Sequence, residues 1–306
     1  MGLTDSITQT EAPRHCGLAI EKQTPQDKVV ALAGNPNVGK STVFNSLTGL
    51  RQHTGNWPGK TVVNAQGRYR HKERNYCMVD IPGTYSLMAN SAEEEIARDF
   101  ICFGGADAVV VVADATCLER NLNLVLQTME ITNRVVLCVN LMDEAKKKRI
   151  RIDFDRLASL LGIPVVGTSA RSGRGLDRLM DAVATLSEGA LNPEPLRAVY
   201  GEAIESAVSL VEPAVADALQ GRLNSRWVSL KLLDGDESLL RSLNHHLGFD
   251  WTQSEEIRLK LAQAGALLEE SGITPDRLRD QVVTKIVETC ESIGRQAIVF
   301  EKKSYA

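Results

Sequence analysis

Residues 34–41 (Gly-Asn-Pro-Asn-Val-Gly-Lys-Ser) have the GxxxxGK[ST] spacing of a phosphate-binding loop, and the apolar run 29–33 before them is typical of a buried strand. In such a loop the glycines let backbone N–H groups surround phosphates, the lysine reaches the β- and γ-phosphates, and the serine hydroxyl binds Mg²⁺. The alternative is a glycine-rich turn between a strand and a helix. The sequence predicts a nucleotide site formed by Gly34, Asn35, Pro36, Asn37, Val38, Gly39, Lys40, Ser41 and Thr42.

Residues 80–83 (Asp-Ile-Pro-Gly) match the DxxG pattern of nucleotide switches. Asp80 can hold a water on Mg²⁺, and the Gly83 N–H can bond the γ-phosphate and release it after hydrolysis. A Pro-Gly turn after a strand is common by itself, so the pattern gains weight from its position after the third predicted strand. We expect the loop that follows Gly83 to be a switch.

Asn140 and Asp143 form an NxxD pattern after the fifth predicted strand. The Asp143 carboxylate can accept hydrogen bonds from the guanine N1–H and N2–H₂ groups, so we expect a buried carboxylate that selects GTP over ATP. An Asn/Asp turn is the alternative. Leu141 stands where such loops usually carry lysine, which predicts modest affinity. Ser169 and Ala170 follow the sixth predicted strand, where a backbone N–H would reach guanine O6.

The segment 52–61 lies between the phosphate-binding loop and the second predicted strand, in the place of a first switch. Thr61 is the predicted second hydroxyl ligand of Mg²⁺, and Thr54 is the alternative. Trp57 lies close to Gly55 and Gly59. We expect this tryptophan to be exposed, in a segment that becomes ordered around a ligand.

These motifs require a sheet whose strand ends bring them together. Short β-branched runs alternate with helical stretches, which predicts an α/β domain with a mostly parallel six-stranded sheet. The second and third strands, joined by a short polar connector, predict an antiparallel hairpin. The predicted strands are 29–33, 61–69, 76–80, 108–113, 135–140 and 164–168.

The Pro-containing segment 191–195 interrupts this alternation and suggests a domain boundary. We therefore expect a polar, partly disordered leader at 1–27, a nucleotide-binding domain at 28–190 and an all-helical domain at 191–306. The helical periodicity predicts a helix from Tyr200 to Leu219, kinked by Pro213, and further helices at 226–233, 237–247, 254–271 and 275–293.

The composition limits the partners. The net charge of −4 over 306 residues argues against a nucleic-acid surface, so no nucleic acid is expected. Six cysteines form no CxxC pair, which fits a reducing cytosol. No apolar stretch reaches the roughly 18 residues of a membrane span, so we expect a soluble chain.

The runs 55–62, 80–87 and 140–143, together with the phosphate-binding loop, closely resemble the cytosolic N-terminal region of the bacterial ferrous-iron transporter family FeoB, and 226–236 resembles its helical domain. The resemblance implies a GTPase module at the cytoplasmic face of the inner membrane, with GTP/GDP, Mg²⁺ and K⁺ as ligands. Its implied partner is a membrane permease domain of the same protein, which this chain lacks. Homo-oligomerisation is left open.

Slow hydrolysis is expected, because Thr84 stands where small GTPases place the glutamine that orients the attacking water. Pro36 would crowd an external arginine finger. We expect Lys40, Asn37, Thr61 and Gly83 to carry the chemistry.

The resemblance further implies that Asn37, with the backbone around Gly55 and Trp57, holds a K⁺ that supplies the missing positive charge. A hydrogen bond at the entry of the helix is the alternative role of Asn37. The rival function is a soluble, ribosome- or RNA-associated GTPase of the Era-like kind. Such a protein should carry a basic appendage with a GxxG loop, and the region after Asn192 has neither.

Overall fold

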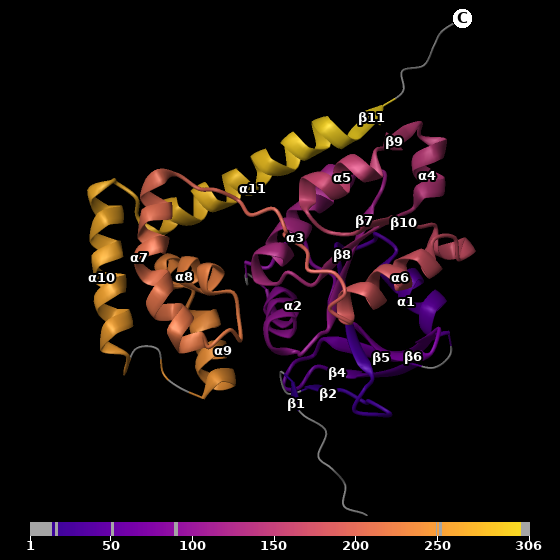
Figure 1. Ribbon diagram of the computed structural model, residues 1–306, viewed down its shortest axis with the longest axis horizontal. Coiled ribbons are helices and arrows are strands. Elements are labelled where there is room, and N and C mark those ends of the chain that lie inside the picture. The colour runs from indigo at the N-terminus through magenta and orange to yellow at the C-terminus, as the bar shows by residue number, and fades with distance from the viewer. Residues whose placement is uncertain are drawn as a thin grey trace, which may run out of the picture.

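A computed structural model describes residues 14–15, 18–49, 52–88, 91–248, 250 and 253–300. An α/β domain and a group of helices lie side by side, and the long helix α11 (Pro275–Ala297) runs from the helical group to the α/β domain (Figure 1). Within the described part of the chain, no helix combines the length and the apolar character needed to cross a membrane.

The central sheet has seven strands in the order β10-β8-β7-β3-β6-β5-β4. The first five pair in parallel, whereas β6–β5 and β5–β4 are antiparallel. The strands are β3 (Lys28–Gly34), β4 (Gln52–Asn56), β5 (Val63–His71), β6 (Arg74–Asp80), β7 (Ala108–Asp114), β8 (Val135–Asn140) and β10 (Val165–Gly167). All six predicted strands and the β5–β6 hairpin are confirmed.

The seventh strand, β4, is a correction to the predicted six-stranded sheet. It occupies the segment expected to be a switch loop, and Gly55 pairs with Asn64 in its ladder with β5. The residues of β4, Gln-His-Thr-Gly-Asn, are polar and carry no apolar alternation. The open edge of β5 supplies the pairing, which no local pattern indicates.

Helices cover both faces of the sheet. On one face lie α1 (Lys40–Thr48) and α6 (Leu176–Ser187), which share a core with the buried side chains of that face. On the other face lie α2 (Ala92–Phe103), α3 (Leu118–Ile131) and α5 (Phe154–Leu161). This second core continues without interruption into the helical group.

The helical group contains α7 (Glu202–Leu219), α8 (Ser225–Asp234), α9 (Glu237–Leu247) and α10 (Glu255–Glu270), together with α11. The predicted helices are confirmed, and α7 continues through Pro213. Each of α8, α9, α10 and α11 begins with a side-chain cap, from Asn224, Asp236, Ser254 and Thr274.

The end of α11 returns to the α/β domain, which the sequence did not indicate. Its continuation β11 (Ile298–Phe300) pairs antiparallel with β9 (Ile150–Ile152), and the Asp153 N–H donates to Ala297 O at 2.9 Å. Each strand is only three residues long. The carboxyl-terminal end of α11 therefore ties the helical group to the α/β domain.

Residues 18–27, which belong to the predicted polar and partly disordered leader, pack in part against the α/β domain. Leu18 and Ile20 are buried in the core, and the Gln66 amide donates to Ala19 O at 3.0 Å beside strand β2 (Leu18–Ala19). Strand β1 (Arg14–His15) pairs with β2, whereas residues 1–13 and 16–17 lie outside the described part.

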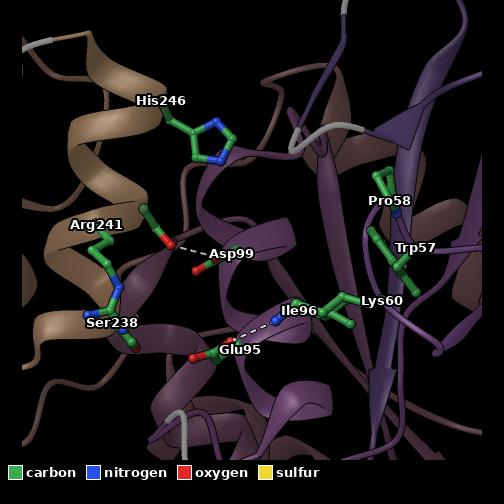
Figure 2. Close-up of a pocket in the computed structure, with 10 residues that line it drawn as sticks. Trp57, Pro58, Lys60, Glu95, Ile96, Asp99, Ser238, Arg241 and His246 are labelled. Carbon is green, nitrogen blue, oxygen red and sulfur yellow. Dashed lines mark hydrogen bonds and ion pairs between the residues drawn. The ribbon is translucent and has the colours of Figure 1, made fainter.

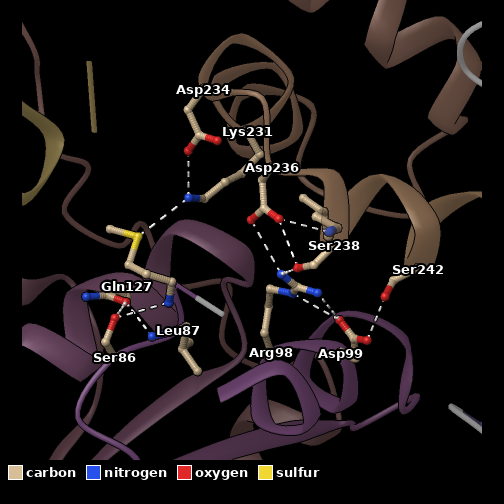
Figure 3. A network of polar contacts seen from close by, with 12 residues as sticks. Ser86, Leu87, Arg98, Asp99, Gln127, Lys231, Asp234, Asp236, Ser238 and Ser242 are labelled. Atoms are coloured by element: carbon tan, nitrogen blue, oxygen red, sulfur yellow. Dashed lines mark hydrogen bonds and ion pairs between the residues drawn. The ribbon is translucent and has the colours of Figure 1, made fainter. Parts of the chain in front are cut away.

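A buried guanidinium joins α2 to α9 (Figure 3). Arg98 is fully buried and donates to Ser238 Oγ at 2.8 Å and to Asp236 Oδ2 at 3.4 Å. It also bonds Asp99, which accepts from Ser242 Oγ at 2.7 Å. A buried charge is tolerated only with such partners, so α2 and α9 are held as one unit.

A second polar contact joins α3 to the segment that precedes α7. Glu130 Oε1 accepts from the Ala198 N–H at 3.1 Å, whereas Glu130 Oε2 and the Tyr200 hydroxyl have no hydrogen-bond partner among the described residues. Both residues line a cavity of about 20 Å³ between α3, α8 and α11, which is large enough for one water. Burial raises the pKa of Glu130, and the Ala198 N–H and Arg226 oppose this.

We predict that Glu130→Gln stabilises the protein increasingly as the pH rises. Because the pKa of Glu130 is raised in the folded state, its contribution is favourable below the unfolded pKa near 4.5 and is lost as the pH rises through the folded pKa. Urea unfolding at about pH 5 and about pH 8 measures the difference, with the exposed Glu269→Gln as control. A gain that is equal at both pH values would contradict this role.

Candidate nucleotide site

The phosphate-binding loop connects the end of β3 to the start of α1 at the carboxyl edge of the sheet. Gly39 has a φ of +83°, and a Cβ there would lie 2.4 Å from Asn140 Nδ2. A Cβ on Gly34 would lie 2.7 Å from Val112 O. Both positions therefore require glycine. Ser41 and Thr42 are exposed at the first turn of α1, where the helix dipole favours an anion.

Lys40 and Asp80 form an ion pair in this structure, and Lys40 Nζ also donates to Ile81 O at 2.7 Å. Their side chains are largely buried, at 11% and 17% exposure. Burial raises the pKa of Asp80, and the charge of Lys40 opposes the rise. The two residues predicted to bind phosphate and Mg²⁺ are thus side by side, each neutralising the other.

The DxxG segment lies against the phosphate-binding loop. A Cβ on Gly83 would be 3.6 Å from Gly34 O and from Pro36 N, and the Thr84 N–H donates to Gly34 O at 3.2 Å. The Thr84 side chain is buried and donates to Ser86 O at 2.7 Å. Its hydroxyl is therefore used within its own turn.

Asn140 joins three segments at the end of β8. Its Nδ2 donates to Val38 O at 3.1 Å, and its Oδ1 accepts from the Ala170 N–H at 3.0 Å and from Thr168 Oγ1 at 3.1 Å. The side chain is buried. The amide thus fixes the phosphate-binding loop against the turn η1 (Ala170–Ser172).

A hollow lies beside this turn, where the sequence predicts the base site. This hollow, of about 1340 Å³, is lined by the start of α4 (Met142–Lys147), by β9, by β10 and by the turn 167–169. Asp143 is exposed in this hollow, whereas a buried carboxylate was expected. Its position at the first turn of a short surface helix explains the exposure. The Asp143 N–H bonds Ser169 Oγ at 3.2 Å, which links the NxxD segment to the Ser-Ala turn.

The backbone N–H groups of the Ser-Ala turn have partners in this structure. The Ser169 N–H donates to Arg174 O at 2.9 Å, and the Ala170 N–H donates to Asn140. Contact of this turn with guanine O6 stays a prediction. Leu141 has a left-handed φ of 63° at the start of α4.

The expected exposure of Trp57 in the first-switch segment is wrong, because its side chain is buried, with 3% of its surface exposed. Its ring makes an edge contact with Phe100 of α2, at 5.4 Å between centroids. Lys60 pairs with Glu95 of α2 at 3.2 Å. Trp57 is therefore a core residue that attaches the first-switch segment to α2. Its burial was not predicted, because its partner Phe100 belongs to a helix distant in the sequence.

The other predicted residues of this segment are not brought onto the phosphate-binding loop. Thr61 is exposed in the turn between β4 and β5, and among the described residues no hydrogen bond links Gly55 or Trp57 to Asn37. Asn37 is exposed with a φ of +66°. The Mg²⁺ role of Thr61 and the K⁺ roles of Asn37, Gly55 and Trp57 stay predictions.

A second hollow, of about 520 Å³, separates this segment from α9 (Figure 2). Trp57 and Lys60 line one side, and Arg241 and His246 of α9 line the other, with α2 between them. His246 stacks on Phe103 of α2 at 4.4 Å. Burial lowers the pKa of His246, as does His245, whereas Asp99 opposes this shift.

Comparison with known proteins decides the family. A model described as Ferrous iron transport protein B matches residues 28–183, and a model described as the FeoB cytosolic helical domain matches residues 200–299. The chain belongs to the FeoB family. The second match lies on the helical region, which distinguishes this chain from the Era-like alternative.

Several FeoB relatives are similar to this chain. The Fe(2+) transport protein A/FeoB fusion protein of Porphyromonas gingivalis is 39% identical over 69% of this chain, and FeoB of Salmonella typhimurium is 38% identical over 68%. The aligned residues are 26% and 27% of those proteins, so the chain spans about a quarter of the length of these FeoB relatives.

Two solved FeoB structures show the same fold. The cytosolic domain of T. maritima FeoB in its apo form has a TM-score of 0.70 and 36% identity, covering 89% of this chain and 99% of that one. Its GMPPNP form has a TM-score of 0.70 and 35% identity, with the same coverage.

Two polar residues of this FeoB chain, Arg98 and Gln127, lie near the predicted switch segments and were not predicted from the sequence. Arg98 lies among the apolar residues Ile96, Ala97, Phe100 and Ile101, and an arginine inside such a run is the one signal that could have marked it. Gln127 lies on the inner face of α3 beside the residues that follow DxxG, and nothing local distinguishes it.

We predict that Asn140→Ala lowers the free energy of unfolding by about 3 kcal/mol, because it removes the side-chain hydrogen bonds of Asn140 to Val38 O, the Ala170 N–H and Thr168 Oγ1. Thr168→Val removes one of these bonds and should cost about 1 kcal/mol. Urea unfolding measures both. Equal losses in the two variants would contradict the central role of Asn140.

Proposed function

We propose that this chain is the GTP-binding and slowly GTP-hydrolysing cytosolic module of a ferrous-iron membrane transporter. The observation that carries the proposal is the convergence of four motifs on one edge of the sheet, where Asn140 joins the phosphate-binding loop to the Ser-Ala turn and Lys40 joins it to Asp80. Relatives are described as Fe(2+) transporters, and solved relatives as GDP and GMPPNP forms.

The residues present fit a magnesium–nucleotide. Lys40 would exchange Asp80 for the β- and γ-phosphates, and Asp80 would turn to the metal's water beside the exposed Ser41 hydroxyl. Mg²⁺ would supply the positive charge that neutralises the phosphate oxygens. Gly83, next to Pro36, would present its N–H to the γ-phosphate. Thr61 would complete the metal site only if the segment 57–62 moves.

The groups around Gly83 support the proposal of slow turnover. Thr84 uses its hydroxyl within its own turn, so its side chain does not orient an attacking water. The side chain of Asn37 could bind a monovalent cation, because it is exposed in the phosphate-binding loop, beside the expected position of the phosphates. The carbonyl of Trp57 accepts from Lys60 at 3.0 Å and would have to be released.

The module would act on a membrane permease domain of the same protein, at the cytoplasmic face of the inner membrane. The helical group is the candidate for transmitting movement of the first-switch segment to that domain. It is linked to this segment because Arg98 bonds α2 to α9 and Phe100 of α2 contacts Trp57.

GTP hydrolysis is expected to be several-fold faster in K⁺ than in Na⁺ at equal ionic strength, since K⁺ would supply positive charge to the phosphates in the transition state. The variant Asn37→Gly should abolish the difference without backbone strain, because glycine adopts the left-handed φ of Asn37. Steady-state phosphate release measures the rates. Equal rates of the unmodified chain in the two salts would contradict the cation proposal.

Asp143→Asn is expected to weaken GTP binding roughly hundredfold and to strengthen XTP binding, because an amide can donate to the C2 carbonyl of xanthine, which replaces the guanine amino group. Asp155→Asn, an exposed aspartate that lines the same hollow, is the control. Titration with fluorescent nucleotides measures both affinities. Unchanged selectivity would remove Asp143 from the base site.

A further inference from the structure

The segment that follows DxxG is held from the side by α3. The Leu87 N–H donates to Gln127 Oε1 at 2.7 Å, and Ser86 Oγ donates to the same oxygen at 3.2 Å (Figure 3). The Met88 N–H in turn donates to Ser86 Oγ at 3.0 Å. A single amide oxygen thus fixes three consecutive residues of this segment.

The orientation of the Gln127 amide is itself fixed. Gln127 Nε2 donates to Asn123 Oδ1 at 3.0 Å, one helical turn earlier, so its oxygen faces Leu87. Gln127 is 7% exposed, and water cannot readily replace these bonds. Asn123 Nδ2 reaches Tyr85 O at 3.5 Å, and the Arg120 guanidinium lies 5.0 Å from the Tyr85 ring centre.

Three residues of α3, Arg120, Asn123 and Gln127, therefore follow the chain from Tyr85 to Leu87 at helical spacing. On the other side, the Thr84 N–H bonds Gly34 O, and Gly83 lies against Pro36. Because residues Tyr85 to Leu87 are held by α3, only the backbone from Ile81 to Thr84 could move when a phosphate binds. The anchor keeps Gly83 close to the place where the γ-phosphate would bind.

We infer that Gln127 is a positioning residue that sets the distance between Gly83 and the γ-phosphate of GTP. The inference rests on the proposed function. Gln127 touches neither the nucleotide nor the reacting atoms in this scheme, and it acts through the backbone of Leu87. GDP, which lacks the γ-phosphate, should not depend on it.

The same helix connects this anchor to the helical region. Near its start, Glu119 packs so closely on Gly294 of α11 that a Cβ there would lie 2.4 Å from Glu119 Oε2. At its end, Glu130 holds the Ala198 N–H. The position of Gln127 is thus determined partly by α11 and by the segment that precedes α7.

The test compares Gln127→Ala with Gln263→Ala, which removes an exposed glutamine from α10. In the nucleotide-free protein, the Leu87 amide of Gln127→Ala should exchange with deuterium about tenfold faster, as expected for the loss of one buried hydrogen bond. The affinity for a non-hydrolysable GTP analogue should fall several-fold, with GDP affinity unchanged. Gln127→Glu keeps the acceptor oxygen for Leu87 and should restore most of the protection and the affinity.

Unchanged exchange at residues 84–88 in Gln127→Ala, or equal losses of GDP and analogue affinity, would overturn the inference. The exchange measurement needs no nucleotide. Failure of the unmodified chain to bind guanine nucleotides would therefore sink the proposed function, whereas normal nucleotide binding with no change in Gln127→Ala would sink only the positioning role.

Discussion

The geometry of the nucleotide edge depends on one buried amide, that of Asn140. The main-chain oxygen of this residue accepts from the Ala115 N–H at 2.9 Å, while its side chain bonds Val38 and Ala170. The loops after β3, β7 and β10 are therefore all hydrogen-bonded to Asn140 at the end of β8. Because an amide offers its donor and its acceptor at a fixed separation, these loops cannot shift independently. The absence of a Cβ at Gly39 allows this close approach.

The same kind of constraint joins the two parts of the molecule. Arg98 is fully buried, and breaking its bonds to Ser238 and Asp236 would leave this charge with Asp99 as its remaining partner among the described residues and a buried N–H group without an acceptor. On the opposite side of α2, Phe100 meets Trp57. Movement of the first-switch segment must therefore either displace α2 together with α9, or open the Trp57–Phe100 contact. The second choice exposes apolar surface but no buried charge, so it is the less costly one.

Local sequence was sufficient wherever the signal is short-range. The strands of the parallel sheet are continuous apolar runs, such as Val109 to Val112, and the motifs at their ends follow fixed spacings. The burial of Trp57 was not predictable in this way, because its partner Phe100 belongs to another element. The pairing of β11 with β9 likewise joins residues nearly half the chain apart.

The candidate site shows the same division. Residue types and spacing predicted that Asp80, Gly83 and Asn140 lie at the phosphate-binding loop, as they do. The same reasoning also placed Thr61, Gly55 and Trp57 there, and the structure does not bring these three onto the loop. Residue types and spacing did not reveal which groups of the site already bond each other. A backbone N–H of the Ser-Ala turn was predicted to reach guanine O6, and the Thr84 hydroxyl was given no role. In the structure the Ala170 N–H bonds Asn140 and the Thr84 hydroxyl bonds Ser86 O, and only the folded chain shows these partners.

The Lys40–Asp80 pair sets a condition on how the proposed nucleotide could enter. Both side chains are largely buried, so removing either partner alone leaves an uncompensated charge in a poorly solvated place. A phosphate without a cation would draw Lys40 away from Asp80, and a cation without a phosphate would draw Asp80 away from Lys40. The charges stay balanced only when the two arrive together. Burial, which raises the pKa of Asp80, makes the unbalanced states still less favourable. Under the proposed function, the Lys40–Asp80 pair therefore favours a metal–nucleotide complex over either component alone.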